Sequence, residues 1–183
     1  MRNASRGRSP LTRAARKDCH MEQHTISVLV ENRFGALARI AGLFSGRGYN
    51  IESLSVNTTE DPNRSRMTIV TSGDDAIIEQ IDKQLSKLVD VRKVSDLTGH
   101  AFIERELILL KVKTTSRTRP EIIQITEIFG GKIVGVHPHE LSIELSGRAG
   151  KIEDFIALMR SFGIIEVART GRVAIPRQPG PIS

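Results

Sequence analysis

The same order of predicted elements occurs twice along this chain of 183 residues. In the first half, residues 25–30 alternate apolar and polar side chains, as a half-buried strand does. From Gly35 the apolar residues take the spacing of one helix face. They are Leu37, Ile40, Ala41 and Phe44. Strands at 50–59 and 65–72, a helix at 73–88 and a strand at 89–97 complete the first set.

The second half repeats this order from residue 104 onward. A strand at 104–114 precedes a helix that opens at Arg119-Pro120, where proline is tolerated. The apolar stripe of this helix is predicted to contain Ile122, Ile125, Ile128 and Phe129. A hairpin and a final helix follow, and that helix has an inward stripe of Ile152, Phe155, Ile156 and Met159. One strand at 164–175 is predicted to close the unit.

Two successive strand–helix–strand–strand–helix–strand units predict an α+β chain made of two tandem ferredoxin-like βαββαβ sandwiches. Right-handed crossovers leave few other topologies for this order. We expect a basic, unstructured tail over 1–23, a first domain over 24–99, a second domain over 100–175 and a proline-rich tail over 176–183.

In such a unit both helices cover one face of the sheet, so the other face must be covered or left to solvent. On the first sheet this face is expected to carry Ser27, Leu29, Thr68 and Val70, and part of it is apolar. Pairing of strands or sheets between two copies of the chain would cover it. We therefore expect a homodimer.

Most of the formal net charge of +6 lies in a short segment at the start of the chain. Residues 1–20 hold six basic side chains and one acid, Asp18, which leaves about +1 for the rest. The part expected to fold is nearly neutral, and its predicted central strands carry no aromatic residue on which RNA bases could stack. We expect no nucleic-acid partner.

The composition favours a cytoplasmic location without a membrane partner. The single cysteine, Cys19, cannot form an internal disulfide, which favours a reducing compartment. No apolar run approaches the ~18 residues of a membrane span. The arginine-rich, acid-poor start of the chain leaves an organelle transit peptide as an alternative. An over-extended start is another, because Met21 directly precedes the first strand-like run.

The chain offers no recognisable catalytic residues and no strong metal site. Glycines at 46, 48, 130 and 131 end helices and do not form a phosphate-binding loop. Two groups of histidines are candidate metal ligands, but neither has enough partners at a suitable spacing. These groups are Cys19 with His20 and His24, and His137 with His139.

The stretch from Val30 to Val56 is the best candidate for a binding site. Asn32 and Gly35 lie where the first strand meets the first helix, and Asn50 follows that helix. A helix N-terminus leaves N–H groups unpaired and favours a carboxylate. Gly35 has no Cβ to block the approach, and asparagine both donates and accepts hydrogen bonds. Asparagine and glycine are also ordinary turn residues, so the pattern alone leaves both interpretations open.

Long phrases in both halves resemble one family, the small regulatory subunits of acetolactate synthase (acetohydroxyacid synthase). These phrases include SVLVENRFGALARIAGLFSGRGYNIESLSV, QIDKQLSKLVDVRKV, TEIFGGKIV and GKIEDFIALMRSFGIIEVARTGRVA. The resemblance covers residues 24 to about 175 and implies that the first unit is an ACT domain, a module that binds amino acids.

The resemblance also implies a ligand and a partner. The ligand would be a branched-chain amino acid, usually valine, held between two ACT domains. The family's effector-contacting positions fall on Asn32, Gly35, Ala36 and Asn50, with Ile51 adjacent. The chain would be non-catalytic and without a cofactor, and would stimulate and feedback-inhibit a catalytic large subunit that carries thiamine diphosphate, magnesium and FAD. The alternative is a stand-alone ACT protein with a different partner.

Overall fold

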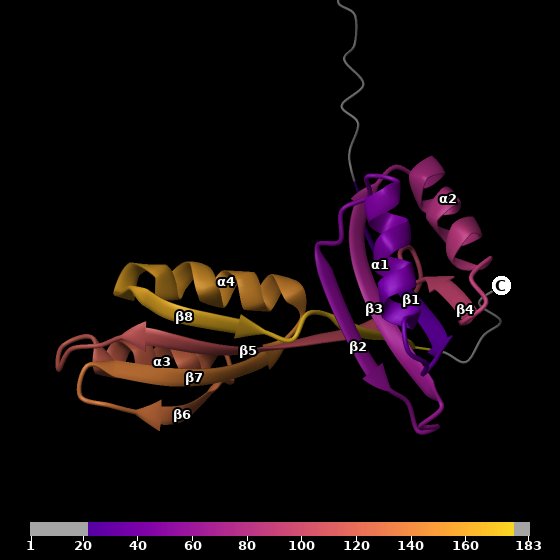
Figure 1. The fold of residues 1–183 in the computed structure, drawn as a ribbon. Coiled ribbons are helices and arrows are strands. Elements are labelled where there is room, and N and C mark those ends of the chain that lie inside the picture. The colour runs from indigo at the N-terminus through magenta and orange to yellow at the C-terminus, as the bar shows by residue number, and fades with distance from the viewer. Residues whose placement is uncertain (1–21, 178–183) are drawn as a thin grey trace, which may run out of the picture.

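The computed structural model describes residues 22–177, which form two units of mixed strands and helices, one after the other along the chain (Figure 1). The first strand begins at Glu22, so the predicted tail of 1–23 is too long by two residues. Residues 1–21 lie outside the described part of the chain. None of the described helices is long and apolar enough to cross a membrane.

The first unit is an antiparallel sheet in the order β2-β3-β1-β4, with both helices on one face (Figure 1). Alternation along β1 points Ile26, Val28 and Val30 at the helices, where all three are buried. The elements are β1 (Glu22–Glu31), α1 (Ala36–Gly46), β2 (Ser53–Thr58), β3 (Arg64–Gly73), α2 (Asp75–Leu85) and β4 (Val91–Asp96).

The second unit repeats this topology, with sheet order β6-β7-β5-β8. Its core joins both helices to β5 and β7, and the predicted inward stripe of the last helix is buried in full. The elements are β5 (Phe102–Lys113), α3 (Arg119–Ile128), β6 (Lys132–Val136), β7 (Glu140–Gly147), α4 (Ala149–Met159), the short 3₁₀ helix η1 (Arg160–Phe162) and β8 (Ile164–Arg169). Two tandem ferredoxin-like sandwiches are therefore confirmed.

Two predicted core positions are wrong. Leu37 is 43% exposed, because α1 buries a narrower stripe that passes through Ala36, Ile40 and Phe44. Ile128 is 74% exposed, and the buried position on that side of α3 belongs to Thr126. The Thr126 hydroxyl donates to a main-chain carbonyl one turn earlier at 2.8 Å, which satisfies this polar group inside the core.

The prediction of one closing strand over 164–175 is also wrong. β8 ends at Arg169, and a separate strand, β9 (Val173–Pro176), pairs antiparallel with the first four residues of β5. The Arg177 N–H then donates to the Ala101 carbonyl at 2.9 Å. The first two residues of the predicted tail of 176–183 therefore belong to the folded part of the chain. Residues 178–183 lie outside the described part.

β9 and residues 102–105 of β5 form a two-stranded ribbon that lies over the first sheet on the face without helices. Within the single chain Ser27, Thr68 and Val70 are already buried, and Leu29 is half-buried. These residues are therefore buried without a second copy of the chain, and the expected homodimer does not follow from the need to cover them. The chain covers most of this face itself, with a strand that the sequence pattern did not reveal.

The turn at 170–172 joins the two units by direct hydrogen bonds. The Arg172 N–H donates to the Ser53 hydroxyl at 3.1 Å, and the Arg172 guanidinium donates to Gln23 Oε1 at 2.8 Å. Gly171 has a φ of 75°, and a Cβ there would lie 2.8 Å from the Ser53 Oγ. A glycine is therefore required for this close approach of the turn to β2.

Candidate functional site

Asn32 ties the end of β1 to the loop between β2 and β3. Its N–H donates to the Asn63 carbonyl at 2.7 Å, and its side-chain Nδ2 donates to the Pro62 carbonyl at 2.9 Å. These bonds orient the carboxamide and leave Oδ1 as the free acceptor among the described residues. Asn32 is exposed, so this oxygen is accessible to a ligand.

Gly35 immediately precedes α1 and has a left-handed backbone with φ 82°. A residue with a side chain would be strained here. The backbone conformation is thus a sufficient reason for glycine at this position. The sequence predicted a different reason for glycine, namely that the missing Cβ lets a ligand approach the backbone.

The N-terminus of α1 is open and has no side-chain cap. Gly35 as N-cap offers no side-chain acceptor, and the first turn contains no acidic residue. The Ala36 N–H bonds weakly to the preceding turn, and the first helical bond is donated by Arg39. The N–H groups of Leu37 and Ala38 have no acceptor within residues 22–177. An anion placed here would satisfy these donors and favourably meet the helix dipole.

Arg39, one turn into α1, is paired and is not free to hold an anion. Its guanidinium contacts Asp90 Oδ2 through Nη2 at 2.6 Å and through Nε at 2.7 Å. The main-chain carbonyl of Asp90 accepts the Glu31 N–H at 2.8 Å. This ion pair holds the start of α1 against the end of β1, so the charge available to a ligand is that of the helix terminus.

Asn50 and Ile51 lie at the other end of α1. The Asn50 carbonyl accepts the Thr71 hydroxyl at 2.7 Å, and its side chain is exposed. Ile51 is half-buried against the first core. The sheet therefore fixes the backbone at this end and leaves the Asn50 carboxamide to solvent.

The five predicted residues fall into two groups that one chain does not bring together. Asn32, Gly35 and Ala36 form the first group, and Asn50 and Ile51 form the second. The first is anchored to Asn63, immediately before β3, and the second to Thr71, eight positions further along the chain. At ~3.3 Å a residue these anchors are about 26 Å apart. α1, which separates the groups, is itself about 16 Å long. A single amino acid cannot touch both groups within one copy of the chain.

Glu52 connects the Asn50 end of the site to the second unit. The pKa of Glu52 lies below its ordinary value, chiefly because its carboxylate accepts a hydrogen bond from the Ser72 hydroxyl and also one from Gln23. Arg172 adds a smaller lowering through its charge. Glu52 is therefore ionised at neutral pH beside the turn that joins the units.

Three apolar residues of the first unit are exposed, which the sequence reasoning did not predict. Phe34, in the turn before α1, is fully exposed, and Leu37 is 43% exposed. Val56, on the edge strand β2, is 37% exposed. Phe34 lies inside the Asn32–Gly35 turn, and this aromatic residue was the available sequence signal for an exposed apolar group beside the candidate site.

The candidate metal ligands do not form a cluster in the described part of the chain. Within residues 22–177 no three His, Cys, Asp or Glu side chains come together as a metal site requires. His24 is buried inside the first unit, while His137 and His139 lie at the β6–β7 loop. Cys19 and His20 lie outside the described residues.

Two family models match the two units in the order in which the chain builds them. Residues 26–93 match the ACT domain that is described as acetohydroxyacid synthase small subunit-like. Residues 105–178 match the model described as the small subunit of acetolactate synthase.

Relatives and a solved structure agree with both matches. The acetolactate synthase small subunit of Aquifex aeolicus is 52% identical over 92% of this chain and 88% of its own length. The isozyme 3 small subunit of Escherichia coli is 51% identical over 83% of this chain and 94% of its own length. A crystal structure of the Thermotoga maritima small subunit superposes with a TM-score of 0.80 at 41% identity, over 87% of this chain and 100% of that one. This chain belongs to the family of acetolactate synthase small subunits, and its first unit is an ACT domain.

Proposed function

We propose that this chain is the non-catalytic regulatory subunit of acetolactate synthase in branched-chain amino acid biosynthesis. The observation that carries this proposal is identity of 51–52% to named small subunits over 83–94% of the two chains compared. The chain binds the catalytic large subunit, raises its activity and makes it sensitive to feedback inhibition by valine. Residues 24–99 act as the effector-binding domain and 100–175 as the second domain of this cytoplasmic subunit.

The chemistry of pyruvate condensation belongs to the partner in this proposal. The catalytic subunit carries thiamine diphosphate, magnesium and FAD, and no cofactor is assigned to this chain. What this chain contributes is a site that recognises an amino acid and a way to pass its occupancy to the partner.

Valine binds with its carboxylate at the open start of α1. The unpaired N–H groups of Leu37 and Ala38 and the missing cap support this placement. The ammonium group meets Asn32 Oδ1, the acceptor that remains after Nδ2 has bonded to Pro62. The asparagine is therefore held in one orientation before the ligand arrives, which reduces the entropy lost on binding.

The second half of the site comes from another copy of the chain. The separation between Asn32 and Asn50 supports this, because only a partner's Asn50 can reach a ligand that is bound at α1. Exposed Phe34 and Val56 lie on the surface that such a partner would cover. Since β2 is an edge strand, two copies can pair there as an isologous homodimer.

Valine then biases the arrangement of the dimer and of the attached catalytic subunit. The backbone after Asn50 leads within three residues to Ser53, which accepts a hydrogen bond from Arg172 in the inter-unit turn. A change at the site therefore has a short route to the second unit. Coupling between two sites of this kind is typically worth ~1–3 kcal/mol, provided that valine favours one state over the other.

The test is turnover of the catalytic large subunit from the same organism, measured with and without this chain across a valine titration. We expect this chain to raise turnover and valine to reverse the rise. Asn32→Ala should keep the stimulation but need about tenfold more valine, because one charge-assisted hydrogen bond is lost. Asn63→Ala, in the loop that Asn32 holds, is the matched control and should behave as wild type.

Two results would contradict the proposal. Turnover that does not respond to this chain would remove the assignment to acetolactate synthase and favour an ACT protein with a different partner. Stimulation with unchanged valine inhibition in Asn32→Ala would keep the assignment and exclude the site.

A further inference from the structure

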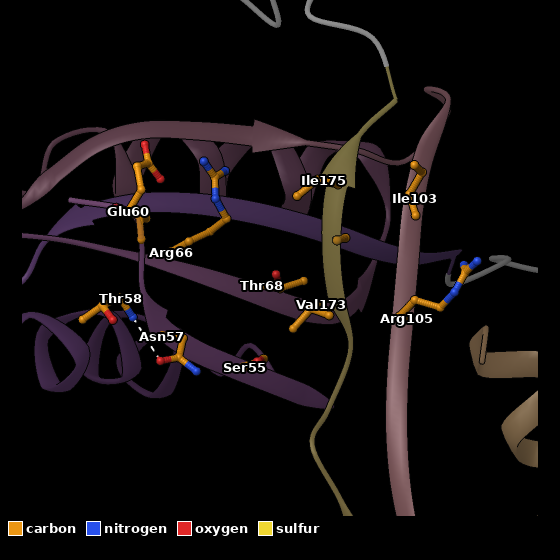
Figure 2. Close-up of a pocket in the computed structure, with 12 residues that line it drawn as sticks. Ser55, Asn57, Thr58, Glu60, Arg66, Thr68, Ile103, Arg105, Val173 and Ile175 are labelled. Atoms are coloured by element: carbon orange, nitrogen blue, oxygen red, sulfur yellow. Dashed lines mark hydrogen bonds between the residues drawn. The ribbon is translucent and has the colours of Figure 1, made fainter. Parts of the chain in front are cut away.

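A groove lies between the first sheet and the ribbon of β5 and β9, on the sheet face opposite the helices (Figure 2). We call it the ribbon groove. Its floor consists of two cross-strand pairs from β2 and β3, Ser55 with Thr68 and Asn57 with Arg66. Its volume of about 380 Å³ is within the range of small-molecule pockets. It is far from α1, because the sheet separates the two.

The floor of the ribbon groove holds polar groups without protein partners. Thr68 is only 3% exposed, yet its hydroxyl makes no hydrogen bond within residues 22–177. The hydroxyl is not fully enclosed by protein. Within residues 22–177 the one fully enclosed side-chain polar atom without a hydrogen-bond partner is Nε2 of His24. The Ser55 hydroxyl on the paired strand also has no partner there. A buried hydroxyl that opens only to a cavity needs a partner in that cavity.

Arg66 supplies the positive charge beside the floor of the groove; Arg105 also lines the groove, but Figure 2 shows its guanidinium pointing away from Thr68. It donates to the Ser27 hydroxyl at 3.1 Å, and no carboxylate in the described residues lies within ion-pair distance of it. Most other arginines that bridge elements here are paired, as Arg39 is with Asp90 and Arg169 with Glu106. Arg66 therefore keeps its capacity to bind an anion.

The wall of the ribbon groove is aliphatic. Ile103 on β5 pairs directly with Ile175 on β9, so their side chains share one face of the ribbon with Val173. Ile175 and Val173 are 53% and 48% exposed, although both border a cavity. Figure 2 places these two side chains on β9 beside the Thr68 floor. An aliphatic group in the groove would remove this apolar surface from water.

We propose that the ribbon groove binds a small aliphatic carboxylate, at a site separate from the one at α1. Arg66 holds the carboxylate, the hydroxyls of Thr68 and Ser55 bond to the polar groups next to it, and the aliphatic part packs on Ile175 and Val173. Both an aliphatic amino acid and the matching 2-oxo acid have this chemistry. Glu60, which also borders the groove, would favour the amino acid through its ammonium group.

The experiment is methyl NMR on the full chain with labelled isoleucine and valine methyl groups, titrated separately with valine and with 3-methyl-2-oxobutanoate. Ile103, Ile175 and Val173 report on the ribbon groove, and Ile51 reports on the site at α1. We expect saturable shifts at the groove reporters with at least one ligand, and tighter binding of valine if Glu60 contributes. Isobutylamine, which lacks the carboxylate, should leave them unshifted.

Three variants separate a bound carboxylate from an indirect effect. Arg66→Gln should weaken binding at the groove reporters about tenfold, which is the loss expected for an exposed charge-assisted hydrogen bond. Thr68→Val keeps the shape and should weaken it severalfold. Lys93→Gln, on the same sheet face but beyond β9, is the matched control and should bind as wild type. The Ile51 response should be the same in all three.

Each outcome separates this inference from the proposed function. Shifts at Ile51 alone would overturn the proposal that the ribbon groove binds a ligand, and they would support the site at α1. Shifts at the groove alone would support the groove and count against the site at α1. Groove shifts that persist in Arg66→Gln, or that isobutylamine also produces, would overturn the carboxylate assignment.

Discussion

Replacing Gly171 with alanine should loosen the contact between the two units. Gly171 has a φ of 75°, in the left-handed region, where an alanine costs about 1–2 kcal/mol. The new Cβ would also lie 2.8 Å from the Ser53 Oγ and 3.3 Å from the Leu54 carbonyl oxygen. Either the turn or Ser53 must move, and the hydrogen bond from the Arg172 N–H to Ser53 is then lost, at about 1 kcal/mol.

Together these terms lower the free energy of unfolding by about 2–3 kcal/mol. For a protein of this size that corresponds to a fall of about 4–12 °C in the melting temperature. Differential scanning calorimetry measures it directly. The matched control is Gly48→Ala, because Gly48 has a similar φ of 73° and no atom lies within 4 Å of the position that a Cβ would take there. In this control the free energy of unfolding should fall only by the cost of the left-handed backbone, about 1–2 kcal/mol.

The difference in melting temperature between Gly171→Ala and Gly48→Ala tests whether the close approach of the turn to β2 stabilises the protein. If Gly171→Ala melts at the same temperature as Gly48→Ala, the close approach of the turn to β2 does not stabilise the protein. The proposed route from Asn50 through Ser53 to the second unit would then have no energetic basis.

Three further predictions concern stability. Gly42→Ala, inside α1 with open space around it, should raise the free energy of unfolding by about 0.5–1 kcal/mol in a chemical denaturation. Glu106→Gln should lower the melting temperature by several degrees, because it weakens a buried bidentate pair with Arg169, a cost of about 1–3 kcal/mol after allowance for the exposure of Arg169. Ser72→Ala should raise the pKa of Glu52 towards its ordinary value in an NMR titration. Because the folded pKa of Glu52 is depressed, its stabilisation is present above the unfolded pKa and lost as the pH falls through the folded one, so this variant should show less acid-side loss.

Much of the fold could be predicted from periodicity, and the exceptions have physical reasons. Alternation placed Ile26, Val28 and Val30 in the core correctly, because a strand has only two faces. A helix stripe has uncertain edges, so Leu37 and Ile128 were assigned to the core although they are exposed.

The second strand of the ribbon was missed because residues 164–175 were interpreted as one closing strand. Gly171, with a charged residue on either side at Arg169 and Arg172, was the available signal for a break. The sequence correctly placed Asn32 and Asn50 at opposite ends of one helix. That the two residues are too far apart to touch one ligand within a single chain depends on where Asn63 and Thr71 anchor them, which the sequence pattern does not show. The ribbon groove could not be predicted, since one wall is built by the strand that was missed.

The central claim is that valine is held between two copies of this chain, and mixing variant chains tests it most directly. Asn32→Ala and Asn50→Ala chains, each purified alone, should bind valine poorly. If a site takes Asn32 from one chain and Asn50 from the other, refolding an equal mixture restores one intact site in every mixed dimer. Random pairing of two chains then predicts recovery of about a quarter of the wild-type sites by calorimetry. No recovery in the mixture, with mixed dimers confirmed by mass spectrometry, would contradict the account.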